Sequence, residues 1–169
     1  MKIPQYLLAL LCPLICLTSC KKDADEISSD TKSSFTLEFE HQVNGAALAL
    51  NTTTYKNAKG EDFKINVFKY YVSNIKLRKA DGTTYLIPES YLLIDESKPA
   101  SKLVTMNDVP TGDYTKIEYT IGVDYARNFA GAQTGALDPI NGMFWTWNSG
   151  YIFVKLEGIS PQSTAANNL

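Results

Sequence analysis

Short segments in which every second residue is apolar, separated by turn residues, constrain this chain more than any other feature. In residues 34–41 the side chains of Phe35, Leu37, Phe39 and His41 alternate with polar ones. Successive side chains of an extended strand point to opposite faces, so this alternation predicts a half-buried strand. It also predicts that the His41 imidazole faces the core or its rim.

Comparable segments follow along the chain. The further strands expected from them are residues 46–50, 63–67, 75–78, 84–87, 91–95, 114–123 and 151–157. Turn residues such as Asn44-Gly45 and Asp81-Gly82 lie between them. The alternation breaks after residue 67, which predicts a bulge or a short helical turn before the strand at 75–78.

These patterns predict an all-β fold, an antiparallel β-sandwich with Greek-key-like connections. No segment has the period of a helix longer than about two turns. Residues 126–142, rich in Ala, Gly and Asn, are expected to form a long loop that is either functional or disordered.

The first 20 residues resemble an export and lipidation signal. Lys2 precedes the apolar residues 6–17, a stretch shorter than the roughly 20 residues that span a bilayer but suited to a signal peptide. Cys20 follows Leu-Thr-Ser, which resembles a bacterial lipobox, where the cysteine is acylated and becomes the new N-terminus. We therefore predict a signal peptide at 1–19, lipidation of Cys20 and a flexible tether over 20–34. The folded domain is expected over 35–169.

The cysteines and charges narrow the function classes. All three cysteines lie in the first 20 residues, so the processed chain has no disulfide and no thiolate metal ligand. It carries 15 basic and 18 acidic residues without a basic cluster, which excludes a typical nucleic-acid binder. We expect a lipid-anchored protein at the outer membrane or cell surface. An anchor on the periplasmic side is the alternative location.

Familiar catalytic motifs are missing from the sequence. It has a single histidine and no nucleophile elbow, phosphate loop or dinucleotide fingerprint. These observations predict a protein that is not an enzyme; a hydrolase with unrecognised residues is the weakest hypothesis.

Two features could carry a binding function, namely His41 and the segment 143–151 (MFWTWNSGY), which holds both tryptophans. If this segment is extended, Met143, Trp145 and Trp147 share one face. Imidazole binds copper well and a thioether favours copper(I). For a lone histidine, the sequence alone favours the simpler interpretation of a hydrogen-bonded core residue. Trp145 and Trp147 would bind a sugar or a protein if exposed, and would fill the core if buried.

Four segments of the chain together resemble the MbnP family of copper-binding proteins, especially its lipoproteins from Bacteroidetes. They are residues 39–41 (FEH), 70–75 (YYVSNI), 112–114 with 121–124 (GDY and IGVD), and 143–151 (MFWTWNSGY). The resemblance implies a periplasmic or surface β-sandwich that holds one copper ion through histidine. In some relatives a tryptophan is oxidised to kynurenine by a di-haem partner protein of the MbnH type.

Carried over to this chain, the resemblance makes His41 the leading copper ligand and Met143 a speculative second one. Trp145 and Trp147 are the candidates for oxidation. The chain departs from the family in offering one histidine, where a copper site normally has two or three protein ligands. Phe39 occupies the position that some relatives give to the modified tryptophan. Family members are usually longer, so we expect this chain to be short at its C-terminus.

The sequence therefore predicts a membrane-anchored, extracytoplasmic copper-binding or copper-handling lipoprotein. The alternative is a metal-free β-sandwich module that binds a carbohydrate or a protein through its tryptophans.

Overall fold

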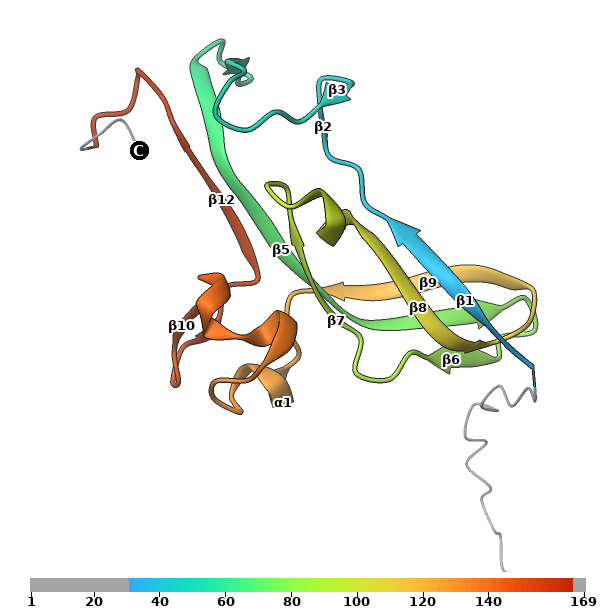
Figure 1. The fold of residues 1–169 in the computed structure, drawn as a ribbon. Coiled ribbons are helices and arrows are strands. Elements are labelled where there is room, and N and C mark those ends of the chain that lie inside the picture. Colours follow the sequence, from blue (N-terminus) through green and yellow to red (C-terminus); the bar gives the residue numbers. More distant parts are fainter. Residues whose placement is uncertain (1–30, 166–169) are drawn as a thin grey trace, which may run out of the picture.

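The structure is a computed structural model that describes residues 31–165, and antiparallel strands make up most of it (Figure 1). Its strands are β1 (Lys32–Glu38), β2 (Gln42–Val43), β3 (Ala46–Ala47), β4 (Tyr55–Lys56), β5 (Asp62–Lys79), β6 (Thr84–Leu86), β7 (Tyr91–Asp95), β8 (Leu103–Pro110), β9 (Tyr114–Ile121), β10 (Phe144–Thr146), β11 (Gly150–Tyr151) and β12 (Val154–Ile159). Its short helices are α1 (Tyr125–Asn128) and the 3-10 turns η1 (Pro99–Lys102), η2 (Gly135–Leu137) and η3 (Pro139–Asn141).

The predicted signal peptide and Cys20 lie outside the described residues. The folded region begins earlier than the sequence indicated, because Lys32 and Ser33 pair with Pro110 and Val109 of β8. Between residues 31 and 165, none of the helices combines the length and the apolar character needed to cross a membrane.

The central strand is β5, which has partners along both of its edges. One edge pairs with β4, β7 and β6, and the other with β12 and β9. Lys69, for example, lies opposite Asp95 of β7 on one side and Lys155 of β12 on the other. These six strands form the larger sheet.

Two irregularities keep most of the apolar side chains of β5 on one face, while Tyr71 packs on the other. The pairing with β12 shifts beside Asn66, and the pairing with β9 shifts beside Asn74, whose φ is 54°. An extra residue in a strand reverses the faces of the residues that follow it. Ile65 and Ile75 thereby join the face that carries Phe68, Tyr70 and Val72. The structure thus confirms the bulge that the broken alternation indicated.

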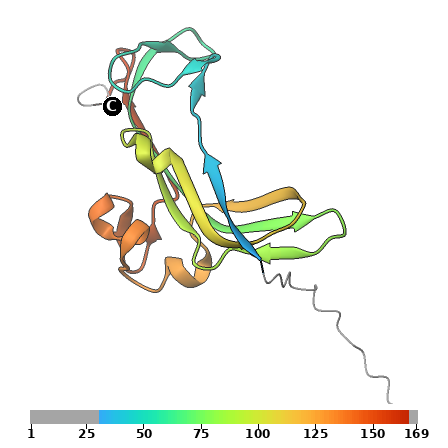
Figure 2. The same cartoon turned by 45° about the vertical axis from the view of Figure 1, so that its right-hand side comes forward.

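A second, smaller layer closes the sandwich. Strands β1 and β8 pair with each other and cross one face of the larger sheet (Figure 2). Phe35 and Leu37 of β1, with Met106 of β8, pack against Val72 and Ile75 of β5. This core confirms the predicted antiparallel β-sandwich. The sequence did not indicate β8, because a bulge at Asp108 (φ 60°) breaks its alternation.

The opposite face of β5 is covered by the segment that precedes β12. Tyr71 packs there against Val123, Leu137, Met143 and Tyr151. Residues 126–142, expected as a long loop, include most of α1 together with η2 and η3, and the Tyr71 hydroxyl donates to the carbonyl of Ala136. Consecutive residues Tyr70 and Tyr71 therefore face two separate cores.

Candidate functional site

His41 lies between β1 and β2, with its imidazole turned inward. Its side chain is 9% exposed, and its ring lies edge-on to Phe68 with a centroid distance of 4.8 Å. The carbonyl of His41 accepts a hydrogen bond of 2.9 Å from the Leu48 amide, which fixes the backbone here. The inward orientation agrees with the alternation in the sequence, although β1 itself ends at Glu38.

One nitrogen of the ring is held by a carboxylate. His41 Nδ1 lies 2.5 Å from Glu96 Oε2, and Lys102 Nζ lies 2.9 Å from the same oxygen. Burial by itself would raise the pKa of Glu96, but the hydrogen bonds from Lys102 and His41 outweigh it, so this pKa is lowered from its ordinary value. An ionised carboxylate only accepts hydrogen bonds, so Nδ1 carries the proton.

The other nitrogen faces a phenol. His41 Nε2 lies 2.8 Å from the hydroxyl of Tyr70, and burial is the main reason that the pKa of Tyr70 is raised to about 12. The phenol therefore stays protonated at neutral pH, and its hydroxyl can donate to Nε2 whenever that nitrogen carries no proton, the form that binds a metal. A histidine that binds a metal through one nitrogen usually donates the other N–H to a carboxylate or carbonyl. The Glu96–His41 pair has this arrangement.

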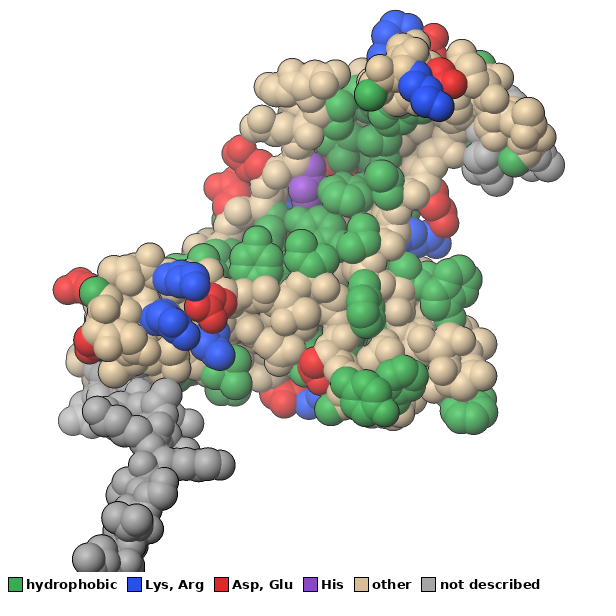
Figure 3. Space-filling model, turned by 180° about the vertical axis from the view of Figure 1, so that it is seen from behind, with side chains coloured by type: hydrophobic (Ala, Val, Ile, Leu, Met, Phe, Trp, Pro, Cys, Tyr) green, Lys and Arg blue, Asp and Glu red, His purple; other side chains and the backbone are tan. Residues whose placement is uncertain are grey.

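A pocket of about 380 Å³ opens beside the ring. Glu38, Glu40 and Glu96 contribute three carboxylates to its lining, and Lys102 contributes one positive charge. Seen from behind, the histidine lies in a band of hydrophobic side chains with acidic groups near it (Figure 3). The excess of negative charge favours the entry of a cation.

The donor atoms that surround the His41 ring are few, and they include a single protein nitrogen. Across residues 31–165, no group of three or more His, Cys, Asp or Glu side chains comes together as metal ligands would. The side-chain atoms in hydrogen-bond contact with the ring are oxygens of Glu96 and Tyr70. Nitrogen and oxygen donors suit copper(II), whereas copper(I) selects thioether and thiolate sulfur.

The structure does not bring Met143 to His41. Its side chain is fully buried beside Tyr71 and Tyr151, on the face of β5 opposite to Tyr70 and His41. Side chains of consecutive strand residues point to opposite faces, so the two candidate ligands are separated by the sheet.

Trp145 and Trp147 are exposed by 67% and 76%. The sequence grouped Met143 with both indoles on one face of an extended segment. Strand β10 instead begins at Phe144, so Met143 precedes the strand and does not share its alternation. Phe144 packs inward on the Tyr71 side of the molecule, which places the tryptophan segment away from His41.

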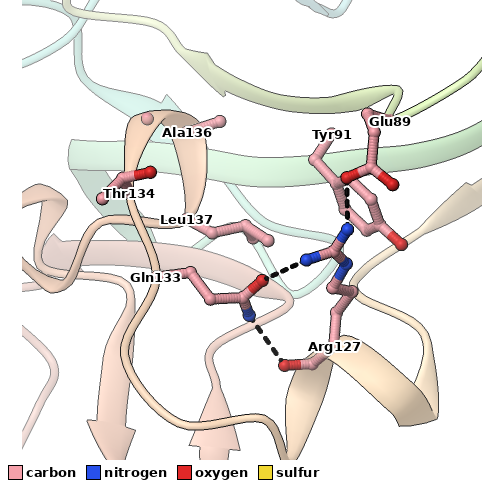
Figure 4. Close-up of a pocket in the computed structure, with 8 residues that line it drawn as sticks. Glu89, Tyr91, Arg127, Gln133, Thr134, Ala136 and Leu137 are labelled. Carbon is pink, nitrogen blue, oxygen red and sulfur yellow. Dashed lines mark hydrogen bonds and ion pairs between the residues drawn. The ribbon is translucent and has the colours of Figure 1, made fainter.

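A second pocket, of about 440 Å³, surrounds Arg127 (Figure 4). The guanidinium of Arg127 pairs with Glu89, donates to Gln133 Oε1 at 3.1 Å and lies 5.5 Å from the ring centre of Tyr91. These contacts tie residues 127–133 to the start of β7. Sequence reasoning missed this cluster, because Glu89 and Arg127 are 38 positions apart and neither belongs to a motif.

The segments that carried the family resemblance meet beside this pocket. Asp124 accepts hydrogen bonds from the Tyr91 hydroxyl and from Asn74 Nδ2, the latter at 3.1 Å. Ser73 Oγ donates to the carbonyl of Gly122 at 2.8 Å. Residues 70–75 and 121–124 are therefore joined through side chains as well as through strand pairing.

Comparison with known proteins agrees with this arrangement. The sequence profile of the MbnP family matches residues 32–168. Among solved structures, MbnP from Methylosinus trichosporium superposes with a TM-score of 0.59 at 17% identity, over 79% of this chain and 57% of that chain. The present chain thus matches little more than half the length of that protein, and the likeness shows the fold. No curated protein sequence matches the chain.

The Glu96 network predicts a pH-dependent contribution to stability. A carboxylate whose pKa is lower in the folded state stabilises the fold above its unfolded pKa, and this contribution is lost as the pH falls through the folded value. We expect Glu96→Gln to lower the free energy of unfolding at pH 7 by about 1–3 kcal/mol, because the charged hydrogen bonds are weakened. Urea unfolding at pH 7 and in mild acid measures the difference.

At acid pH the free energies of unfolding of Glu96→Gln and of the wild type should differ less than at pH 7. Glu40→Gln, at an exposed position on the rim of the same pocket, serves as the control. An equal loss of stability by Glu96→Gln at both pH values would contradict the role given to the Glu96 charge.

Proposed function

Because the chain belongs to the MbnP family, we propose that it is an extracytoplasmic lipoprotein that binds or handles copper. It is held through lipid on Cys20 at the outer membrane or cell surface. The lipobox-like sequence before Cys20 supports the anchor, and the domain that begins at Lys32 leaves residues 21–31 as a tether. We propose a binding role rather than a catalytic one.

The observation that carries the copper proposal is the state of the His41 ring. Nδ1 is fixed by Glu96, and Nε2 lies 2.8 Å from the hydroxyl of Tyr70 beside an acidic pocket. Copper held at Nε2 would take the place of the hydrogen bond from Tyr70. Glu96 would then orient the ligand and increase its basicity.

The surroundings of the ring favour copper(II) at this position. His41 would supply the nitrogen, the carboxylates of Glu38 and Glu40 line the pocket, and the sulfur of Met143 lies on the other face of the sheet. Bound copper would supply a redox-active ion with open coordination positions, and the chain would hold it in a partly buried pocket.

We predict that the mature protein binds one copper(II) ion and that His41→Ala abolishes this binding, since it removes the one nitrogen ligand. Glu96→Gln should weaken binding about 10- to 100-fold, as the loss of a partner that orients the ligand typically does. Copper titration followed by electron paramagnetic resonance, with its nitrogen coupling, measures both effects.

Tyr70→Phe is the matched control, because it removes the competing hydroxyl and keeps the aromatic ring. It should bind copper at least as tightly as the wild type. If His41→Ala retains the nitrogen coupling and the affinity of the wild type, His41 is not the ligand.

The proposal includes oxidation of Trp145 or Trp147 by a di-haem partner of the MbnH type. Both indoles are exposed and accessible to another protein. The segment that carries them packs on the Tyr71 side of β5, so a kynurenine there would be separate from the His41 pocket.

We expect the intact mass of the protein to exceed that of the unmodified sequence when the partner is co-expressed with its oxidant, because kynurenine has one more oxygen and one fewer carbon than tryptophan, the carbon leaving as formate. Peptide mapping would place the change at Trp145 or Trp147. An unmodified mass in the presence of an active partner would remove this chemistry from the proposal.

The exposure of the two tryptophans also favours a second candidate function, a metal-free module that binds a carbohydrate or a protein. Exposed indoles stack on sugar rings and anchor protein interfaces. In that case glycan-array binding by the metal-free protein should be lost in Trp145→Ala and kept in His41→Ala. Binding to no glycan on the array would count against the carbohydrate form of this candidate.

A further inference from the structure

The segment from Asp124 to Tyr151, here named the aromatic lobe, exposes a concentration of large apolar side chains. Tyr125 is exposed by 82% and Ile140 by 88%, and Trp145, Trp147 and Phe129 are each exposed by half or more. Single exposed apolar residues are ordinary on protein surfaces. Five of them within one segment, among them both tryptophans of the chain, indicate a surface that is covered in use.

The aromatic lobe has few charged residues, as expected of a surface that is covered by an apolar partner. The segment contains three charged residues, Asp124, Arg127 and Asp138. Arg127 is paired with Glu89, Asp124 accepts from Tyr91, and Asp138 Oδ1 accepts from the amide of Ile140 at 2.9 Å. Each charge is thus engaged within the protein, while the lobe exposes five large apolar side chains.

The start of β1 lies near the end of β5, where Tyr114 pairs with Lys79, and the lobe lies beside the middle of β5, next to Tyr71. Both lie in the half of the molecule away from β2–β4 (Figures 1 and 2). Hydrophobic side chains also stand out in this half in the view from behind (Figure 3). Residues 21–31 span at most about 40 Å when fully extended, so a lipid on Cys20 holds this half near the membrane.

We infer that the aromatic lobe rests in the interfacial region of the lipid bilayer, as a second contact beside the lipid on Cys20. Tryptophan and tyrosine favour the depth of the headgroups, because their rings are apolar with a polar tip. An apolar surface that enters the bilayer by about 5–10 Å adds to the affinity of an acyl anchor. The inference rests on the anchor proposed above and is independent of copper.

Both indoles lie in the lobe, so the tryptophan fluorescence of the whole protein reports on this surface alone. The acylated protein, made without a tryptophan-oxidising partner, is reconstituted in phosphatidylcholine vesicles. Some vesicles carry phosphatidylcholine brominated near the headgroup end of its acyl chains, where bromine quenches nearby indoles. A neutral lipid is chosen so that quenching reports the apolar contact and not an attraction between charges.

We expect a blue-shifted emission and a loss of fluorescence in the brominated vesicles, together with protection from iodide in the water. The double variant Tyr125→Ser, Ile140→Ser should lose much of this quenching while both indoles remain. Leu86→Ser, Leu103→Ser is the matched control, since Leu86 and Leu103 are exposed by about half but lie outside the lobe. It should behave as the wild type does.

Suppose that the protein floats with the vesicles, but its fluorescence is equal with and without brominated lipid and iodide quenches it fully. This result would overturn the inference. A Cys20→Ser protein separates the two proposals. If the processed wild type carries no lipid and does not float with the vesicles, the proposed anchor is wrong. If mixing that lipid-free protein with vesicles also leaves its fluorescence unchanged, the membrane contact of the lobe is wrong as well. Quenching in the variant with Cys20→Ser supports the lobe by itself.

Discussion

The larger sheet depends on a single strand. Strands β4, β6, β7, β9 and β12 all pair with β5, and no pairing joins these five strands to one another within the described region. Main-chain hydrogen bonds along both edges of β5 therefore hold this sheet together, and the core under β1 and β8 packs against the same strand. The extra residues at Asn66 and Asn74 let one strand of 18 residues keep its apolar side chains on one side. A regular strand would have turned half of them away from the core.

The candidate copper site is also built on β5. Tyr70 and Phe68 come from β5, and Glu96 follows β7, which pairs with β5 up to Asp95. His41 and Lys102 arrive from the other layer, next to β1 and β8. The four polar groups form a chain of hydrogen bonds in which the carboxylate has a cation on one side and the imidazole on the other. Such a network orders the ring in a single orientation, which is a precondition for using one nitrogen as a ligand.

Much of the fold was readable from the sequence, because alternation and turn residues are local. The strand at residues 91–95 and the turns at Asn44-Gly45 and Asp81-Gly82 lie where they were predicted. The inward direction of His41 was also local information. Its partners were not, because Tyr70 and Glu96 are 29 and 55 positions away and neither residue type marks a site by itself. Strand β8 escaped detection because the bulge at Asp108 breaks its alternation, and Met143 was misgrouped with the tryptophans because the strand begins one residue after it.

Tyr70 and Tyr71 are neighbours in the chain but lie on opposite faces of β5. Tyr70 contacts His41, and Tyr71 packs with Met143 under the aromatic lobe. A slip of β5 by one position along its partners would carry the side chain of Tyr70 to the other face of the sheet, away from the imidazole. The register is held against such a slip by contacts that tolerate no translation, such as Ser73 on the carbonyl of Gly122 and Ser90 Oγ on the amide of Ile75. These two serine hydroxyls thus help to keep the hydroxyl of Tyr70 beside His41 Nε2.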